Sequence, residues 1–163
     1  MRIVGVDPGM SGALAVYDHG TLESVHDMPV LDGQVDGGAL AELLDEWGPE
    51  MVCVERVQPM PRVGTIASFK LGMNYGIVLG VATALSHPVV TLRPSEWKRR
   101  MGLLKKNKEA SRHLAIELWP NHAQMFRLVK HDGRAEAALI ARAYAFQAIH
   151  IENAEGYPGG GAT

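Results

Sequence analysis

The stretch Met1-Arg-Ile-Val-Gly-Val-Asp7-Pro8-Gly9 decides the fold. Five of its first six residues can pack in a sheet, and Pro8-Gly9 turns the chain immediately afterwards. The pattern predicts an opening strand over residues 2–7. Asp7 then lies at the rim of the sheet, with its carboxylate presented to solvent.

Three more acidic residues occupy comparable places. The apolar run Met51-Val-Cys-Val-Glu55 is typical of a buried strand that ends in one acid. Further on, Asp132 and Glu136 are four residues apart at the start of a predicted Ala-rich helix, so both can face the same side. Acids at a helix N-terminus also suit the helix dipole.

Each acid has a simpler structural explanation. Asp7 and Glu55 would then be solvated strand ends, and Asp132 would be a helix N-cap with Glu136 completing the capping interaction. Together, however, the four supply the hard oxygen ligands that Mg²⁺ or Mn²⁺ requires. We therefore predict a divalent-metal site with catalytic function, built from Asp7, Glu55, Asp132 and Glu136.

Length and composition indicate one domain over residues 1–150, followed by a flexible tail over 151–163, since the chain has 163 residues, 47% of them hydrophobic. The single cysteine, Cys53, excludes an intramolecular disulfide and a thiolate zinc site, and favours a reducing, cytoplasmic location, that of the host if the protein is phage-encoded. The longest apolar candidate, 76–85, is too short to span a membrane, so no membrane partner is expected, and the N-terminus shows no signal peptide.

The net charge of −2 gives no overall nucleic-acid signature, but its distribution is uneven. Acidic residues gather in the first third of the chain. A basic segment follows later, and its side chains are predicted to contact a phosphate backbone: Arg93, Lys98, Arg99, Arg100, Lys105, Lys106, Lys108 and Arg112. The alternative is a solvated helix surface. Within this segment Lys106 and Lys108 are candidates for neutralising the transition state, and we count Lys108 among the catalytic residues.

The periodicity predicts an α/β fold with a central five-stranded mixed sheet flanked by helices. Strands are expected at 2–7, 12–17, 20–28, 51–55 and 88–92, the first three as a meander, and helices at 36–47, 65–86, from 94 through Trp97, 107–118 and 132–150.

Several short motifs occur in order along residues 1–150: Gly5-Val-Asp7-Pro-Gly9 with Ser11-Gly12, Val54-Glu55, Phe69-Lys70-Leu71-Gly72 with Gly76, Arg93-Pro94-Ser-Glu-Trp97-Lys98, Lys106-Asn-Lys108-Glu-Ala-Ser-Arg112 and Asp132-Gly-Arg-Ala-Glu136. Through these motifs the chain resembles the RuvC-like Holliday junction resolvases of the RNase H-like nuclease superfamily, particularly their compact phage and poxvirus type. Asp-Pro-Gly alone also occurs in actin-like ATPases, but this chain lacks the length for their two lobes.

The resemblance implies an RNase H-like fold and a Mg²⁺-dependent endodeoxyribonuclease of DNA recombination and repair, with Mn²⁺ able to substitute. It implies a homodimer that cuts four-way DNA junctions by paired symmetric nicks. Asp7, Glu55, Asp132 and Glu136 would hold two metal ions, both bridged by Asp7. One ion would activate the attacking water, and the other would stabilise the departing 3′ oxygen.

The chain departs from the family at its last pair of acids. Bacterial resolvases usually space these acids by three residues and use aspartate as the second, whereas here the spacing is four and the second is Glu136. Either Asp132 or His131 therefore completes the metal shell.

The predicted long helix carries two further open questions. Phe69 and Lys70 are predicted to contact DNA, with the alternative that Phe69 packs in the core. Gly72, Gly76 and Gly80 recur on one face, and this face serves either a dimer interface or close packing within the chain.

The sequence leaves two other functions open. A flap or fork endonuclease would use the same scaffold, because a metal site reads only a phosphate. A non-catalytic protein that binds branched DNA would rely on the basic segment alone, although such a binder gains nothing from four carboxylates that face phosphates.

Overall fold

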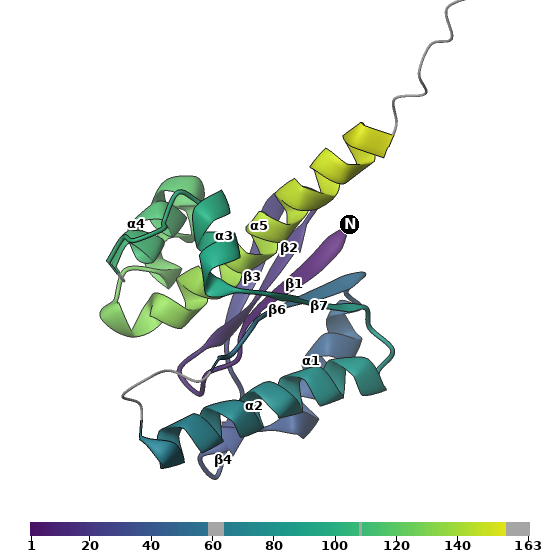
Figure 1. Ribbon diagram of the computed structural model, residues 1–163, viewed down its shortest axis with the longest axis vertical. Coiled ribbons are helices and arrows are strands. Elements are labelled where there is room, and N and C mark those ends of the chain that lie inside the picture. The colour runs from purple at the N-terminus through teal and green to yellow at the C-terminus, as the bar shows by residue number, and fades with distance from the viewer. Residues whose placement is uncertain (59–63, 108, 156–163) are drawn as a thin grey trace, which may run out of the picture.

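The computed structural model describes residues 1–58, 64–107 and 109–155, and a five-stranded mixed sheet forms its centre (Figure 1). The strands lie in the order β3-β2-β1-β6-β7. Their bounds are β1 Arg2–Asp7, β2 Ala13–Asp18, β3 Thr21–Asp27, β6 Met51–Glu55 and β7 Val89–Leu92. β1, β2 and β3 form an antiparallel meander, and β6 and β7 run parallel to β1. The predicted sheet is confirmed.

Helices cover both faces of the sheet (Figure 1). The helices are α1 Gly37–Trp47, α2 Thr65–Ala84, α3 Pro94–Arg100, α4 Glu109–Leu118 and α5 Asp132–Glu155, with short 3₁₀ helices η1 Pro120–Met125 and η2 Val129–His131. α5, α3 and α4 share one hydrophobic core with the sheet, and α1 and α2 share the other.

The alternation of side chains along β1 assigns each residue to one face, because successive side chains of a strand point to opposite sides. Val4 and Val6 pack toward α1 and α2, whereas Ile3 lies in the α5 core. Gly5 shares the face of Ile3, and a Cβ added there would lie 2.1 Å from the carbonyl oxygen of Ala137 in α5. The missing side chain therefore lets α5 approach the sheet.

A two-stranded hairpin, β4 Val30–Leu31 with β5 Gln34–Val35, was not predicted. Its strands are too short to show a period, but Asp32 and Gly33 both have positive φ, of 50° and 78°. An Asp-Gly pair in this conformation is the sequence signal of a tight hairpin turn. The side chain of Asn74 in α2 accepts a hydrogen bond from the Val35 amide and fixes the hairpin on that helix.

Two predicted helix ends need correction. α5 continues to Glu155 rather than ending at 150, and residues 156–163 of the predicted tail lie outside the described residues. α2 ends at Ala84 rather than at 86.

α2 is apolar around most of its circumference, and by length and composition alone it could cross a membrane. The expectation that no apolar stretch is long enough is therefore wrong for this helix. Val78 and Ala82 are buried in the core beneath the sheet. On the other side Ile66 and Phe69 are 76% and 67% exposed, which removes the core position foreseen as one alternative for Phe69.

Candidate metal centre

Two of the four predicted acids meet at one edge of the sheet. β1 and β6 are parallel neighbours, with Val6 opposite Val54, so that Asp7 and Glu55 end adjacent strands at the same edge. Gly5 and Cys53, two residues earlier in each strand, both face α5, and the period of two carries Asp7 and Glu55 to that face.

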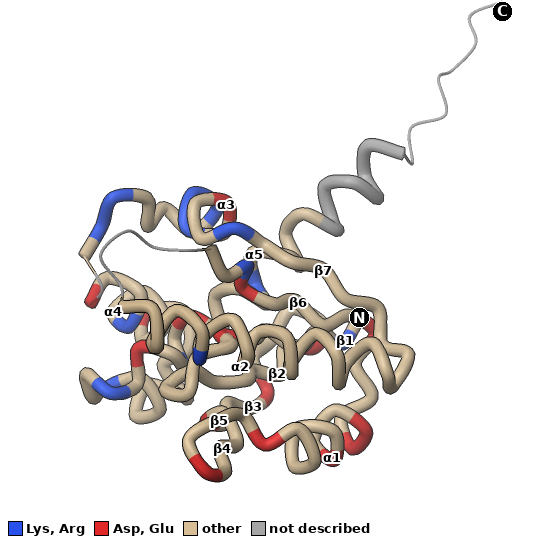
Figure 2. The backbone as a smooth tube through the Cα atoms, turned by 60° about the horizontal axis from the view of Figure 1, so that its bottom comes forward, with Lys and Arg blue, Asp and Glu red and all other residues tan. Residues whose placement is uncertain are grey.

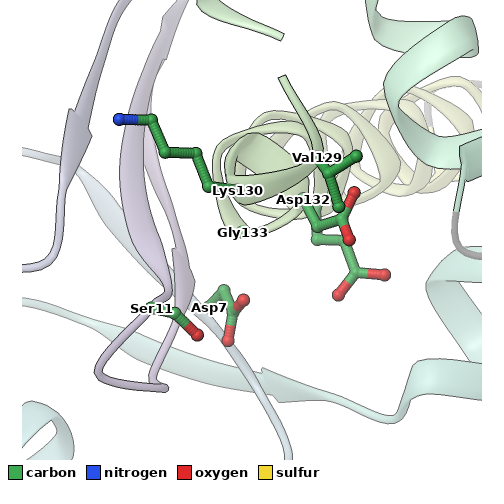
Figure 3. Close-up of a pocket in the computed structure, with 7 residues that line it drawn as sticks. Asp7, Ser11, Val129, Lys130, Asp132 and Gly133 are labelled. Atoms are coloured by element: carbon green, nitrogen blue, oxygen red, sulfur yellow. The ribbon is translucent and has the colours of Figure 1, made fainter. Parts of the chain in front are cut away.

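α5 begins over this edge and brings in the other two acids. An added Cβ at Gly133 would lie 2.5 Å from the Ser11 carbonyl oxygen and 3.1 Å from Asp7 Oδ2, so glycine lets the helix start against β1 and its turn. A cavity of about 250 Å³ results. Its lining is Asp7, Ser11, Val129, Lys130, Asp132, Gly133 and Glu136. Figure 3 shows Asp7 facing the start of α5 across this space, while Lys130 extends away.

Burial and mutual repulsion raise the pKa values of the strand acids. Burial raises the pKa of Asp7 to about 6, opposed by the Gly9 amide that bonds it, and the charge of Glu136 raises it further. Burial likewise raises the pKa of Glu55 to about 7, with Glu136 and Asp7 adding to the rise. The three carboxylates therefore form one electrostatically coupled group, in which the charge of Lys98 offsets only part of the repulsion.

Three of the acids pair with side chains of α3 or α4, two through hydrogen bonds from N–H groups and one through an ion pair. Trp97 Nε1 donates to Glu55 Oε1 at 2.8 Å. Lys98 Nζ lies 3.1 Å from Glu136 Oε1, and Arg112 Nε donates to Asp132 Oδ1 at 2.7 Å. The sequence did not predict these contacts, since they join segments 20 to 42 residues apart.

The carboxylates are of the type that binds a divalent cation, although their oxygens do not converge on one point in this structure. Among residues 1–58, 64–107 and 109–155, no three His, Cys, Asp or Glu side chains lie close enough to hold a single ion. The donor set is nevertheless all hard oxygen, and the buried, mutually repelling carboxylates call for positive charge. Lys98 supplies part of that charge at Glu136.

His131 and Asp132, the two candidates for the last ligand, face different cavities. Burial lowers the pKa of His131, and its Nδ1 accepts the Leu128 amide at 3.4 Å. It lines a second cavity beside Asp27, which Arg134 holds through two bonds of 2.6 Å. Asp132 lines the cavity of Asp7 and Glu136 instead, so the geometry favours Asp132 as the ligand.

The predicted DNA-contacting residues are spread over two surfaces. Basic positions gather around α3 in Figure 2, at its N-cap, within the helix and in the segment after it: Arg93, Lys98, Arg99, Arg100, Lys105 and Lys106. Phe69 and Lys70 lie exposed on α2, which packs on the other face of the sheet from α3 (Figure 1). Lys108 lies outside the described residues. Arg112 differs from the others: only 8% of its side chain is exposed, and its guanidinium bonds Asp132, a position that does not favour the predicted DNA contact.

The raised pKa values predict how the stability of the metal-free protein depends on pH. In the folded protein the pKa values of Asp7 and Glu55 are about 6 and 7, above their ordinary values of 3.8 and 4.5. The folded state therefore binds more protons than the unfolded state across that pH window. The free energy of unfolding should therefore fall as pH rises from about 4 to 7, by about 3 kcal/mol at most for Asp7. Urea unfolding in a chelator at both ends of this window measures the fall.

Asp7→Asn should flatten this dependence, whereas Asp45→Asn, at an exposed position on α1, should leave it unchanged. Added Mg²⁺ should restore the stability lost at neutral pH, because binding to the folded state alone stabilises it. An Asp7→Asn protein with the same pH dependence as the wild type would contradict the electrostatic account.

A five-stranded mixed sheet flanked by helices, with carboxylates at two strand ends and on the last helix, defines the class of RNase H-like nucleases. Solved structures agree on the fold. Thermus thermophilus RuvC, solved with a Holliday junction substrate, matches with a TM-score of 0.69 at 22% identity, over 92% of this chain and 96% of that one. The fowlpox virus Holliday junction resolvase matches with a TM-score of 0.61 at 18% identity, over 91% and 99%.

Sequence comparison gives the family, although no family model matches the chain. Crossover junction endodeoxyribonuclease RuvC of Thermomicrobium roseum is 31% identical over 117 residues, which cover 63% of this chain and 68% of that protein. The chain belongs to the RuvC family. The chloroplastic Holliday junction resolvase MOC1 of Chlamydomonas reinhardtii is 36% identical over 83 residues, half of this chain but only 9% of the length of that protein.

Proposed function

We propose that this protein is a metal-dependent endodeoxyribonuclease that resolves four-way DNA junctions. One observation carries the proposal: the sheet edge and the start of α5 bring Asp7, Asp132 and Glu136 around one open cavity, with Glu55 coupled to them, in a member of the RuvC family. Acids that lie close together despite their burial and mutual repulsion are typical of a site that binds cations.

Asp7, Glu55, Asp132 and Glu136 would hold two Mg²⁺ ions, or Mn²⁺ in their place. Bound there, such ions supply Lewis acidity and a nucleophilic water at neutral pH. Asp7 lies between the β6 and α5 acids, since its turn contacts Gly133 and its charge acts on Glu55, so it suits the bridging position. Trp97 orients the Glu55 carboxylate by donating to one of its oxygens.

The basic surface around α3 would hold the DNA beside this site. Arg99 and Arg100 are exposed on α3, and Lys105 and Lys106 are exposed on the segment that follows. Lys98 belongs to both regions, because its amine pairs with Glu136 and its side chain is 33% exposed. We infer that Lys98 turns to a DNA phosphate when Glu136 takes up a metal ion, and that Lys108 assists from the same segment.

We further propose a homodimer formed through α2. Added Cβ atoms at Gly72, Gly76 and Gly80 would meet no heavy atom of the described residues within 4 Å, so these glycines serve no close packing there. The same helix exposes Ile66 and Phe69. An apolar, glycine-lined face lets a second copy approach closely, and two copies place two metal centres on one junction.

Gly76→Arg should weaken this dimer without harming the monomer, since the position is open space within one chain and arginine favours a helix. Sedimentation velocity should show a shift from dimer to monomer, and paired nicks should become single uncoordinated nicks. Glu42→Arg, on exposed α1, serves as the matched control and should leave the dimer intact. A monomeric wild type, or a dimeric Gly76→Arg protein, would contradict the assignment of α2.

The substrate is tested with labelled four-way junction, 5′ flap, fork and linear duplex DNA, each incubated with the purified protein and Mg²⁺. Symmetric paired nicks in the four-way junction, without cutting of the other three DNAs, support the proposal. Preferential cutting of flap or fork DNA would keep the chemistry and change the substrate. Tight junction binding without cleavage would identify a binding protein instead. We place the activity in a reducing, cytoplasmic compartment, as the single buried Cys53 suggests.

A further inference from the structure

Arg112 is a buried cation with more than one partner. It lies on α4 and is only 8% exposed. Its Nε donates to Asp132 Oδ1 at 2.7 Å, and its Nη1 donates to the Arg127 carbonyl at 3.4 Å. Glu109, one turn earlier on the same helix, lies 3.9 Å from Nη2. The guanidinium therefore joins α4, the segment before η2 and the first residue of α5.

A guanidinium this buried needs specific partners, because removing a charge from water is unfavourable unless it is paired and hydrogen-bonded. Glu109 is 61% exposed and lies at the limit of ion-pair distance, so it contributes little. Asp132, at 2.7 Å, is the principal partner. Because only 8% of its side chain is exposed, Arg112 offers little surface to a DNA phosphate.

The contact also determines what the Asp132 carboxylate can do. Oδ1 is committed to Arg112, whereas Oδ2 has no hydrogen-bond partner among the described residues. Asp132 lines the cavity that holds Asp7 and Glu136, and it is 32% exposed. One oxygen of the Asp132 carboxylate is therefore hydrogen-bonded to Arg112, and the other is free to bind a ligand in the cavity.

We propose that Arg112 is a positioning residue, which fixes Asp132 so that its free oxygen can bind a divalent cation. The proposal rests on the proposed metal-dependent function. Mutating a residue that orients a metal-binding carboxylate through a hydrogen bond typically lowers metal affinity by about 10–100-fold. Lysine would keep the charge but lose the planar fork that reaches Asp132 and the Arg127 carbonyl together.

The test measures metal and DNA binding separately for Arg112→Gln, Arg112→Lys and Arg99→Gln. Free Mn²⁺, followed by electron paramagnetic resonance during titration, gives metal affinity without turnover. Arg112→Gln should weaken Mn²⁺ binding by roughly 10–100-fold, and Arg112→Lys should weaken it less. Junction affinity in a chelator should change less than about twofold in both. Arg99→Gln, at an exposed position on α3, should show the reverse pattern.

A double-variant cycle shows whether Arg112 acts through Asp132. Arg112→Gln added to Asp132→Asn should weaken Mn²⁺ binding little beyond the single Asp132→Asn change, because the group that Arg112 orients is already lost. Additive losses would overturn the proposal, as would an Arg112→Gln protein that is folded, binds Mn²⁺ normally and binds junction DNA weakly. If Arg112→Gln fails to fold, Arg112→Lys carries the comparison. A wild type that binds no Mn²⁺ would instead overturn the metal centre itself.

Discussion

Asp7→Asn is expected to abolish junction cleavage, with a loss of at least about 10³-fold, or about 4 kcal/mol of transition-state stabilisation. Asp7 ends the central strand of the sheet, lines the cavity with Asp132 and Glu136, and couples electrostatically to Glu55. Asparagine has nearly the same shape but lacks the charge that holds a cation. Single-turnover cleavage of a labelled junction in Mg²⁺ measures the effect.

The same change should leave the fold and DNA binding intact. Removing a buried carboxylate whose pKa burial raises to about 6 should stabilise the metal-free protein at neutral pH, rather than unfold it. Junction affinity in a chelator should be equal to that of the wild type or higher, because one repulsion of phosphate is lost. Asp45→Asn provides the matched control with full activity. Residual cleavage by Asp7→Asn above about a tenth of the wild-type rate would contradict its role.

Gly5→Ala is expected to have the largest effect on stability. Its Cβ would lie 2.1 Å from the Ala137 carbonyl oxygen and 2.7 Å from the Ala141 amide nitrogen, and neither backbone atom can rotate away. α5 would have to move off the sheet, so we expect a loss of at least about 3 kcal/mol. The corresponding fall in Tm is roughly 6–12 °C.

Thermal unfolding of Gly5→Ala beside Gly38→Ala tests this contact. An added Cβ at Gly38, in the first turn of α1, lies 3.4 Å from Asp36 Oδ1, an ordinary contact, so this control should unfold at the wild-type temperature or above. Because Asp7 lies two residues beyond Gly5 on the same face, cleavage should fall along with stability. A Gly5→Ala protein as stable as the wild type would show that α5 packs farther from the sheet than described.

The sheet and the strand-terminal acids were predictable because their signals are local. The opening run to Asp7 and the apolar run to Glu55 each carry strand and turn information within a few residues. Parallel pairing of β1 with β6 then brings the two acids together. The β4–β5 hairpin was missed although Asp32-Gly33 signalled it, since two-residue strands show no period.

The partners of the acids were not predictable, because they depend on how distant segments pack. Arg112 reads from sequence as one more cation of a basic segment, yet α4 turns it inward to Asp132. Lys98 reads the same way and lies beside Glu136. Gly133 occupies the position three residues before Glu136 where bacterial resolvases usually place an acid, and its contact with the Ser11 carbonyl leaves no room for one.

The most direct test of the metal centre is anomalous diffraction from crystals grown or soaked in Mn²⁺. The crystals contain the wild-type protein with bound junction DNA, under conditions that prevent DNA cleavage. We expect anomalous peaks in the cavity between Asp7, Asp132 and Glu136, with Glu55 turned toward one of them and Lys98 displaced from Glu136. Mn²⁺ density elsewhere on the protein, with Lys98 still paired to Glu136 and this cavity free of metal, would contradict this expectation.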